Sequence, residues 1–499
     1  MLKELDTVKL IFGLKVQQLR REQQLSYQQL SDKTGLAISY LHNIEKGKKY
    51  PKADKILALA KALKTDYNYL VSLDAGKKLQ PIIDLLKSDF LQIFPLELFG
   101  INTPKLMELL SHTPDKVNAF VNTIIKIVRN YHLKGEDFYQ AALRSYQDLQ
   151  DNYFADIEEI VKQFRRKSGL KQDDTLDTKQ LETLLATTFG INVNRTRLNQ
   201  EVVLQRIRSY YAPKKKVLYL NTGLDTVQEN FLLAKELGFQ VLELSPRPFE
   251  TRMLEGKSFD KLLNNFKASY FAVALLFSEA AVIKEVKAMA NWKQWDETKF
   301  LALLDKYHLS SEMLLQRLAN ILPQHFGIND IFFLRFSTGP EIARFKMTKE
   351  MHLSQLHEPH ANQLDEHYCR RWISINLIRR LKARQGIENI EGPIADVQIS
   401  NYWNTPNAYL CICTAKVSSD DPKDSTSVTI GLLVNESLRR LFKWIDHPAI
   451  KTKDVHTACE RCPISDCDTR AAPPVVLWNN RSQDAILAAL KGIDQQTRG

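Results

Sequence analysis

Three cysteines near the C-terminus have a spacing that could bind a metal ion. Cys459, Cys462 and Cys467 stand in TACERCPISDCDTR, which gives the pattern Cys-x2-Cys-x4-Cys. Thiolates suit soft ions, and a tetrahedral site needs a fourth ligand, for which Cys369 in HYCRRW is the best candidate. We therefore expect zinc or an iron–sulfur cluster at these four cysteines. Reduced structural thiols and a redox switch are the alternatives.

A helix-like stretch in the middle of the chain holds a glutamate where a hydrolytic site could be. LLAKELGFQVLEL, residues 232–244, places Lys235, Glu236 and Phe239 in the pattern Lys-Glu-x-x-Phe. In zinc peptidases, His-Glu-x-x-His puts two imidazoles on one helix face, with the Glu as general base. Lys has an ordinary pKa of about 10.4, so its charge repels zinc, and Phe has no lone pair. We therefore expect no zinc here and no enzymatic activity.

The elements around this stretch resemble those of the ImmA/IrrE metallopeptidase family. LETLLATTFGINV predicts a helix and a strand, KKKVLYLNTGL a second strand, and FKASYFAVALLFSEAAVIKEV a later helix. The resemblance implies a third, acidic ligand near Lys267, so a cation replaces it as well. We interpret Lys235, Glu236, Phe239 and Lys267 as an effector pocket that favours anionic and apolar groups, such as an acyl-CoA. In the alternative, Glu236 has a structural role and pairs with Lys235, Lys267 or a backbone donor.

Two short helical segments separated by a glycine turn lie within residues 8–73, which is typical of a helix-turn-helix. In SYQQLSDKTG, Ser26 can cap the first of them, and Gln29 can complete a capping box. In LAISYLHNIEKGKKYP, Leu41 and Ile44 fall on the side that must be buried. The residues that we expect to contact DNA are Ser26, Tyr27, Gln28, Ser39, Tyr40, His42, Asn43, Lys46, Lys48 and Lys49.

The second helix of this motif is the one expected to enter the major groove. Ser39, His42 and Asn43 can then face base edges, and the lysines that follow can neutralise phosphates. The spacing through ILALAKAL, with its Ile-Glu-x-Gly close, resembles the Cro/C1-type (XRE) helix-turn-helix family, and this resemblance implies a phosphate contact by Tyr27. A generic helical bundle with a polar surface is the alternative.

The remaining segments predict a helical connection followed by mixed α/β structure. Apolar residues recur every three or four positions between 74 and 170, which indicates either a linker packed on the next domain or a dimerisation region. Further on, FFLRFSTG, PIADVQIS and AYLCICTAKV predict strands, and we expect one of Cys411 and Cys413 to face the core. DEHYCRRWISINLIRRLK and SVTIGLLVNESLRRLFKWI are read as long helical segments.

Length and composition favour a multidomain protein of the cytoplasm. The chain has 499 residues, a net charge of +11 and no run of eighteen apolar residues, and MLKELDTVKL lacks an apolar signal core. We expect no membrane association, and the positive charge favours a polyanionic partner. The predicted fold class is an all-α N-terminal part followed by α+β domains. Its expected domains are a helix-turn-helix domain (1–73), a helical linker or dimerisation region (74–170), an ImmA/IrrE-like domain (171–324) and a C-terminal sensor domain (325–499).

Nearly the whole chain resembles the short-chain fatty acyl-CoA regulator family of bacterial transcription factors. The shared features include FYQAALRSYQDLQDNYF, ASYFAVALLF, FFLRFSTG and CERCPISDCDTRAAPP, whereas FSEAA and CDTRAAPP depart from the family pattern. The resemblance implies a regulator of carbon and fatty-acid metabolism that binds double-stranded DNA and responds to acyl-CoA as a small-molecule effector. We also expect a homodimer, because helix-turn-helix proteins usually bind paired half-sites. The rivals are a zinc-dependent or iron–sulfur redox sensor that binds DNA and an ImmA-like metalloprotease.

Overall fold

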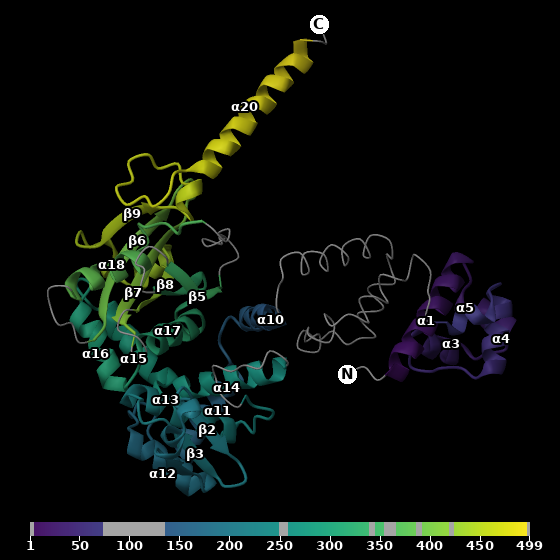
Figure 1. Ribbon diagram of the computed structural model, residues 1–499, viewed down its shortest axis with the longest axis horizontal. Helices are drawn as coiled ribbons and strands as arrows, with labels where there is room; N and C mark the ends of the chain where they lie inside the picture. Colours follow the sequence, from purple (N-terminus) through teal and green to yellow (C-terminus); the bar gives the residue numbers. More distant parts are fainter. Residues whose placement is uncertain are drawn as a thin grey trace. The chain divides into compact units, whose positions relative to one another are not determined.

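The computed structural model divides the chain into two compact units (Figure 1). The first comprises Met1–Tyr146 with Leu254–Leu263, and the second comprises Gln147–Met253 with Asn264–Gly499. The expected architecture, a helical N-terminal part followed by mixed α/β structure, is confirmed. The structure describes residues 4–72, 135–248, 258–338, 345–353, 366–385, 392–418 and 424–496.

The N-terminal head of the first unit is a bundle of five helices around one apolar core. Phe12, Leu30, Leu41, Ile44 and Leu59 are among the side chains buried in that core. Both positions that were expected to face inward from the second motif helix are therefore buried. The helices are α1 (Glu4–Glu22), α2 (Tyr27–Thr34), α3 (Ile38–Glu45), α4 (Ala53–Ala62) and α5 (Tyr67–Val71).

Local sequence fixes the turn between α2 and α3. The Ser26 side chain accepts a hydrogen bond from the backbone N–H of Gln29, whose own side chain accepts from the backbone of Ser26, so the predicted capping box is confirmed. Gly35 ends α2 in the left-handed conformation at φ 67°, which favours glycine. On the other side of α3, a Cβ added to Gly13 would lie 2.3 Å from the carbonyl oxygen of Ile44. Only glycine therefore lets α1 approach the end of α3 so closely.

The segment that was expected to be a linker or dimerisation region is described only in its last part. The expected helices at 86–101 and 115–133 lie outside the described residues. The third expected helix forms as two, α10 (Gly135–Leu149) and α11 (Ala155–Lys167), with a break at residues 150–154. α11 belongs to the second unit and buries Ile157, Val161 and Phe164 there.

The part of the second unit that was expected to resemble the ImmA/IrrE family combines a small sheet with six helices. Its sheet has the order β1-β3-β2, in which β1 pairs parallel to β3 and β2 pairs antiparallel to it. The stretch predicted to be the active helix is α13, and Ser278 caps α15 by accepting from the backbone of Ala281. The elements are α12 (Thr178–Phe189), β1 (Asn192–Asn194), β2 (Ser209–Ala212), β3 (Val217–Leu220), α13 (Thr226–Val241), α14 (Phe259–Leu276), α15 (Glu279–Ala290), α16 (Glu297–Tyr307) and α17 (Ser311–Phe326).

A six-stranded sheet with the order β5-β4-β8-β7-β6-β9 forms the C-terminal part. Neighbouring strands are antiparallel except β6 and β9, which are parallel. α18 contacts β7 and β8, and α17 contacts β4 and β8. The elements are β4 (Ile331–Thr338), β5 (Phe345–His352), α18 (Ile373–Gln385), β6 (Ile394–Tyr402), β7 (Ala408–Val417), β8 (Ser425–Leu433), α19 (Glu436–Leu441), β9 (Lys451–Val455) and α20 (Val475–Gln496).

Two sequence-based expectations for this sheet are wrong. SVTIGLLV, read as the start of a helix, is most of β8, a strand with neighbours on both sides. Its β-branched residues and glycine suit a buried strand better than a helix. Cys411 and Cys413 are both buried in the same apolar cluster, because residues two apart on a strand point to the same face.

No described helix is by itself long and apolar enough to span a membrane. One pair passes the same test jointly, α14 with α15, and it is bent by 61° at the break between its helices.

Candidate functional sites

One side of α3 presents polar side chains to solvent. Ser39 and His42 are exposed and Asn43 is half-buried, whereas Leu41 and Ile44 on the opposite side are fully buried. This division follows from helical periodicity, since positions three and four apart share a face. After the helix, Lys46 is half-buried, and Lys48 and Lys49 are exposed. Hydrogen-bonding side chains therefore lie next to free ammonium groups, as contact with base edges and phosphates requires.

A buried ion pair holds α3 in place. Nε and Nη2 of Arg20 on α1 donate to the two carboxylate oxygens of Glu45 at 2.6 and 2.9 Å. The Tyr27 hydroxyl on α2 donates to the same carboxylate at 2.8 Å, and the Arg20 guanidinium lies 4.0 Å from the centre of the Tyr27 ring. Burial and this bond to Glu45 raise the pKa of Tyr27 to about 12. The carboxylate of Glu45 on α3 thus accepts hydrogen bonds from both α1 and α2, which connects the three helices.

This arrangement bears on the phosphate contact expected of Tyr27. Phosphate oxygens only accept hydrogen bonds, and the Tyr27 proton is already donated to Glu45. A phosphate contact through that hydroxyl would require this bond to break. The ring instead lies edge-on to His42, with centroids 5.8 Å apart, and so supports the exposed side of α3. Arg20 and Glu45 were not among the expected site residues, although Glu45 belongs to the Ile-Glu-x-Gly motif at the end of α3.

The other three expected DNA contacts lie near the start of α2 or on the flank of α3. Ser26 and Gln28 are exposed, and the Gln28 amide donates to Asp32 at 2.9 Å. Tyr40 is half-buried, and the Lys55 ammonium lies 4.7 Å from its ring centre. The expected residues thus lie on neighbouring parts of one bundle.

The carboxylate of Glu236 on α13 forms an ion pair with an arginine. Nη1 of Arg247 lies 3.0 Å from each oxygen of that carboxylate, and Gln240 donates to it at 2.7 Å. The Arg247 guanidinium lies 4.1 Å from the ring centre of Tyr211 and 5.1 Å from that of Phe239. Burial raises the pKa of Glu236, and the charge of Arg247 opposes this rise. Arg247 and Gln240 therefore donate hydrogen bonds to this carboxylate, and the charge of Lys235, one of the expected partners, also attracts it.

Lys235 also has an internal partner. Its ammonium donates to the side chain of Asn265 on α14 at 2.7 Å, and the residue is 4% exposed. Burial lowers the pKa of Lys235 to about 7, well below the ordinary lysine value on which the expected repulsion of zinc was based. α13 and α14 approach so closely that a Cβ on Gly238 would lie 2.9 Å from the carbonyl oxygen of Ala268.

These contacts bear on the expected effector pocket, which stays a prediction. Lys235 and Glu236 are turned to internal partners, and Phe239 is buried beneath Arg247. Lys267 is half-buried on α14. None of the four is among the residues that line a pocket found elsewhere in this unit.

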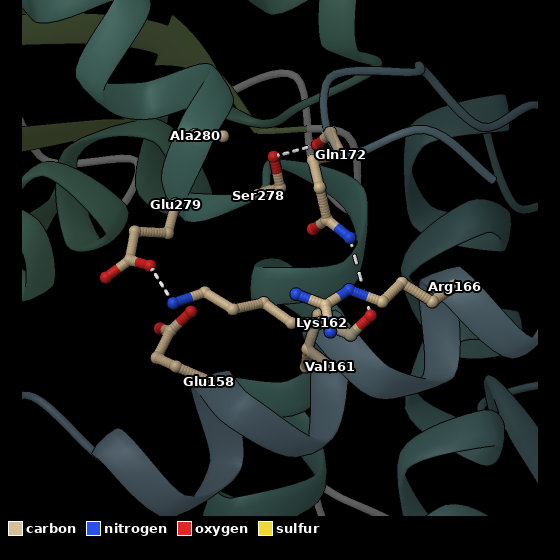
Figure 2. A pocket seen from close by; sticks show the side chains of 8 residues that line it. All are labelled: Glu158, Val161, Lys162, Arg166, Gln172, Ser278, Glu279 and Ala280. Carbon is tan, nitrogen blue, oxygen red and sulfur yellow. Dashed lines mark hydrogen bonds and ion pairs between the residues drawn. The ribbon is translucent and has the colours of Figure 1, made fainter.

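That pocket lies between α11, the segment that follows it, and the start of α15 (Figure 2). It has a volume of about 300 Å³. Lys162 and Arg166, one turn apart on α11, supply two cationic groups, and Arg166 is exposed. Gln172 donates to the backbone of Lys162 at 3.4 Å, which holds the connecting segment over the helix. The lining residues are Glu158, Val161, Lys162, Arg166, Gln172, Ser278, Glu279 and Ala280.

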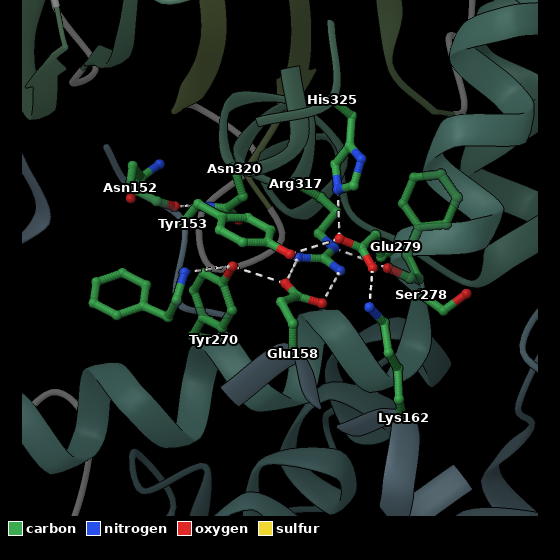
Figure 3. A network of polar contacts seen from close by, with 12 residues as sticks. Asn152, Tyr153, Glu158, Lys162, Tyr270, Ser278, Glu279, Arg317, Asn320 and His325 are labelled. Carbon is green, nitrogen blue, oxygen red and sulfur yellow. Dashed lines mark hydrogen bonds and ion pairs between the residues drawn. The ribbon is translucent and has the colours of Figure 1, made fainter. Parts of the chain in front are cut away.

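A polar network forms the inner wall of the pocket (Figure 3). Glu158 on α11 and Arg317 on α17 are almost completely buried and form an ion pair, with Nη2 of Arg317 2.9 Å from Glu158. Tyr270 on α14 donates to the same carboxylate at 2.7 Å. Because removing one partner of a buried ion pair costs about 3–5 kcal/mol, this network fixes α11 against α14 and α17.

Glu279 is the second centre of this network. It accepts from Tyr153 at 2.6 Å, contacts His325 at 2.5 Å and forms an ion pair with Lys162. Although burial alone would raise it, hydrogen bonds from Lys162, Tyr153 and His325 hold the pKa of Glu279 at about 2. Lys162 therefore belongs to the network and to the pocket, so that a ligand near its ammonium would act on α11, α15 and α17 together.

The four predicted metal ligands gather at one corner of the C-terminal sheet. Cys369 lies beside the segment of Cys459, whose backbone N–H donates to His367. Burial raises the pKa of Cys369 to about 11, and the charges of Cys459 and Cys462 add to this rise. The backbone around them is held by Arg470, which donates to the carbonyl oxygens of Cys459 and Cys462 at 3.0 and 3.3 Å.

These thiols are close, but they are not arranged as a ligand set. Within the described part of the chain, no group of three or more His, Cys, Asp or Glu side chains is placed to hold a metal ion. The Cys467 thiol forms a hydrogen bond with the Thr469 hydroxyl at 3.6 Å. The metal site at the four cysteines therefore stays a prediction.

Two family models match parts of the chain. Residues 13–75 match the helix-turn-helix domain. The N-terminal head is thus a helix-turn-helix domain. Residues 186–319 match the IrrE N-terminal-like domain, so the resemblance seen in the middle of the chain is confirmed as well.

A solved structure of a Mycobacterium tuberculosis transcriptional regulator is also similar. Its identity to this chain is 17% and the TM-score is 0.47, over 66% of this chain and 92% of that chain. No curated protein matches.

Proposed function

We propose that this protein is a sequence-specific DNA-binding transcriptional regulator, with the helix-turn-helix domain as its reading head. The observation that carries the proposal is α3, whose exposed side bears Ser39 and His42 while the buried Arg20–Glu45 pair fixes its position. Such a helix can enter the major groove without reorganising. Since helix-turn-helix proteins read paired half-sites, the protein acts as a homodimer.

The IrrE-like domain has a non-catalytic role in this proposal. A peptidase of this kind needs a metal-bound water beside its glutamate, and here Arg247 bonds both oxygens of Glu236. Metal analysis with a cleavage assay on the full protein tests this point. Stoichiometric zinc that depends on Glu236, together with proteolysis, would overturn it.

The effector is an anionic metabolite of the acyl-CoA type, and the protein regulates carbon and fatty-acid metabolism. The pocket beside Lys162 and Arg166 supports this better than the predicted site at Lys235, because Arg166 is exposed and Lys235 is not. Ligand pockets usually span about 300–1,000 Å³, so a pocket of this size takes only the end of such a molecule. Binding there would act on DNA binding through α11, which the Glu158–Arg317 pair connects to the rest of the unit.

Two experiments test the proposal. Selection of genomic fragments by the purified protein, with and without acyl-CoA, reports the operator and the effector together; the absence of any enriched sequence would contradict DNA reading. Calorimetric titration of the full protein with an acyl-CoA tests the pocket. Arg166→Ala should weaken binding, and Lys167→Ala, an exposed neighbour on the same helix, should not. If only Lys235→Met weakens binding, the site first predicted holds the effector.

A zinc or iron–sulfur redox sensor remains the second candidate function. The gathering of Cys369, Cys459 and Cys462 at one corner favours it. An anaerobic absorption spectrum separates its two forms, since iron–sulfur clusters absorb visible light and a zinc site does not.

A further inference from the structure

The C-terminal helix α20 carries apolar side chains that nothing in the described part of its unit covers. It runs over Val475–Gln496, and Figure 1 shows it extending away from the sheet. Trp478, Ile486 and Leu490 are each more than half exposed, and so is Leu487. Isolated helices are marginally stable in water, and exposed apolar patches usually mark interaction sites. A partner that covers this helix is therefore expected.

A stripe of apolar residues runs along one side of α20. At 100° per residue, Trp478, Ala485 and Ala489 fall within about 40° of one another, and Ile486 and Leu490 flank them on one side. Leu487 lies on the opposite face. The line formed by Trp478, Ala485 and Ala489 thus contains one very large residue followed by two of the smallest.

This order of sizes makes the stripe complementary to itself. If a second α20 runs antiparallel, Trp478 of each copy meets Ala485 of the other, so that a bulky ring fills the space above a methyl group. In a parallel pair, Trp478 would oppose Trp478, and Ala485 would oppose Ala485, which gives a clash and a void. The two-fold axis then falls near Ser482, between the two apolar ends of the helix.

The charge of α20 is also compatible with pairing to the same helix of a second copy. Between Val475 and Leu490 the helix carries one cation, Arg481, and one anion, Asp484, whereas the chain as a whole has a net charge of +11. A neutral surface neither repels its copy nor attracts DNA or an anionic membrane. A single helix offers less than the roughly 800 Å² per partner of a standard interface, so this contact alone gives a weak, concentration-dependent dimer.

We infer that α20 is a dimerisation element, in which the helices of two copies pair antiparallel with Trp478 against the partner's Ala485. This inference rests on the proposed dimer and gives it an interface. The earlier candidate region, 74–170, lies mostly outside the described residues.

Sedimentation of the full-length protein over a range of concentrations tests the pairing. Ala485→Trp should shift the association constant by at least roughly tenfold toward monomer, and Trp478→Ala should also weaken association. The double variant W478A/A485W should restore the dimer, because the large and small residues exchange places. Leu487→Trp adds the same ring on the opposite face and should leave association unchanged.

The outcomes separate this inference from the proposed function. A protein that is monomeric at every concentration overturns the pairing, as does an equal loss with Leu487→Trp. Weakening by both single variants without rescue in the double variant points to another occupant, such as a different segment of the chain or a lipid surface, and also overturns it. DNA binding by the same proteins is measured separately, so failure of DNA reading and failure of the pairing are distinguishable.

Discussion

Nη1 of Arg247 lies 3.0 Å from both carboxylate oxygens of Glu236, on the helix where a zinc peptidase holds its catalytic glutamate. The guanidinium supplies a positive charge next to this carboxylate and contacts the rings of Tyr211 and Phe239. Two of the residues that replace metal ligands therefore have partners inside the domain, since Lys235 donates a hydrogen bond to Asn265 and the Phe239 ring lies against Arg247.

Removal of Arg247 should destabilise the IrrE-like domain. Glu236 is 5% exposed, and Arg247→Ala leaves its charge without this partner, which costs about 3 kcal/mol at most because the arginine is partly exposed. The double variant E236Q/R247A should recover part of the loss, since no buried charge remains. The free energy of unfolding from denaturant titration checks both. Equal stability of R247A and the wild type would show that the pair does not stabilise the domain.

Lys235 should make stability depend on pH. Its pKa of about 7 in the folded state is below the usual value, so between about pH 7 and pH 10 the unfolded chain binds a proton that the folded chain does not. The free energy of unfolding therefore rises with pH through this window. Below pH 7 the folded protein bears the full cost of burying a protonated Lys235. Lys235→Met should remove this dependence and raise stability near pH 7, by an amount on the order of 4 kcal/mol at most.

The controls for Lys235 are two further variants. Lys235→Arg keeps a charge that cannot be lost, so it should be less stable than the wild type at all these pH values. Lys267→Met removes a half-buried lysine of the neighbouring helix and should leave the pH dependence as it is. Thermal unfolding between pH 6 and pH 10 is the measurement, and an identical pH profile for Lys235→Met and the wild type would contradict the lowered pKa.

Gly13 should be required for DNA binding although it lies far from the reading face in sequence. Gly13→Ala places a Cβ 2.3 Å from the carbonyl oxygen of Ile44, so α1 and α3 must separate. Overpacking of this kind costs typically about 1–3 kcal/mol, and it should weaken binding to all DNA sequences alike. Lys61→Ala, at an exposed position of α4, is the control. Circular dichroism melting and DNA titration measure the two effects.

Elements with strong local signals could be predicted from sequence, and tertiary partners could not. The capping box at Ser26 and the burial of Leu41 and Ile44 follow from spacing alone. By contrast, Arg247 stands eleven residues after Glu236, in a stretch without helical or strand periodicity, so nothing local indicates their contact. The pocket beside Lys162 was missed for the same reason, since its walls come together only when α11 packs on the rest of its unit.

The misreading of β8 has a different cause. SVTIGLLV is a short apolar run, and periodicity alone does not separate a buried strand from a buried helix. Its neighbours β4 and β7 lie about ninety and ten residues away in the sequence, so pairing with them decides the structure. The β-branched residues were the signal that could have been used.

The cysteine corner should bind metal through several thiols if the prediction from spacing holds. Cys462→Ser and Cys459→Ser should then each lower the metal content of the purified protein, since a structural site needs all of its ligands. Cys413→Ser, in the core of the sheet, is the matched control and should keep the metal. Elemental analysis and the visible spectrum are the readouts. Equal metal content in all three variants would leave the thiols with a structural role.

The DNA-reading face should separate into residues that specify sequence and residues that supply affinity. Lys48 is exposed beyond the end of α3, so Lys48→Ala should weaken binding on all sequences and reduce the salt slope by about 1. Ser39 is exposed on the helix itself, and Ser39→Ala should change sequence preference by about 1–3 kcal/mol at one base pair. Titrations at several salt concentrations with operator and unrelated DNA measure both. If Lys48→Ala keeps the wild-type salt slope, its ammonium does not contact a phosphate, and α3 must enter the groove at a different angle.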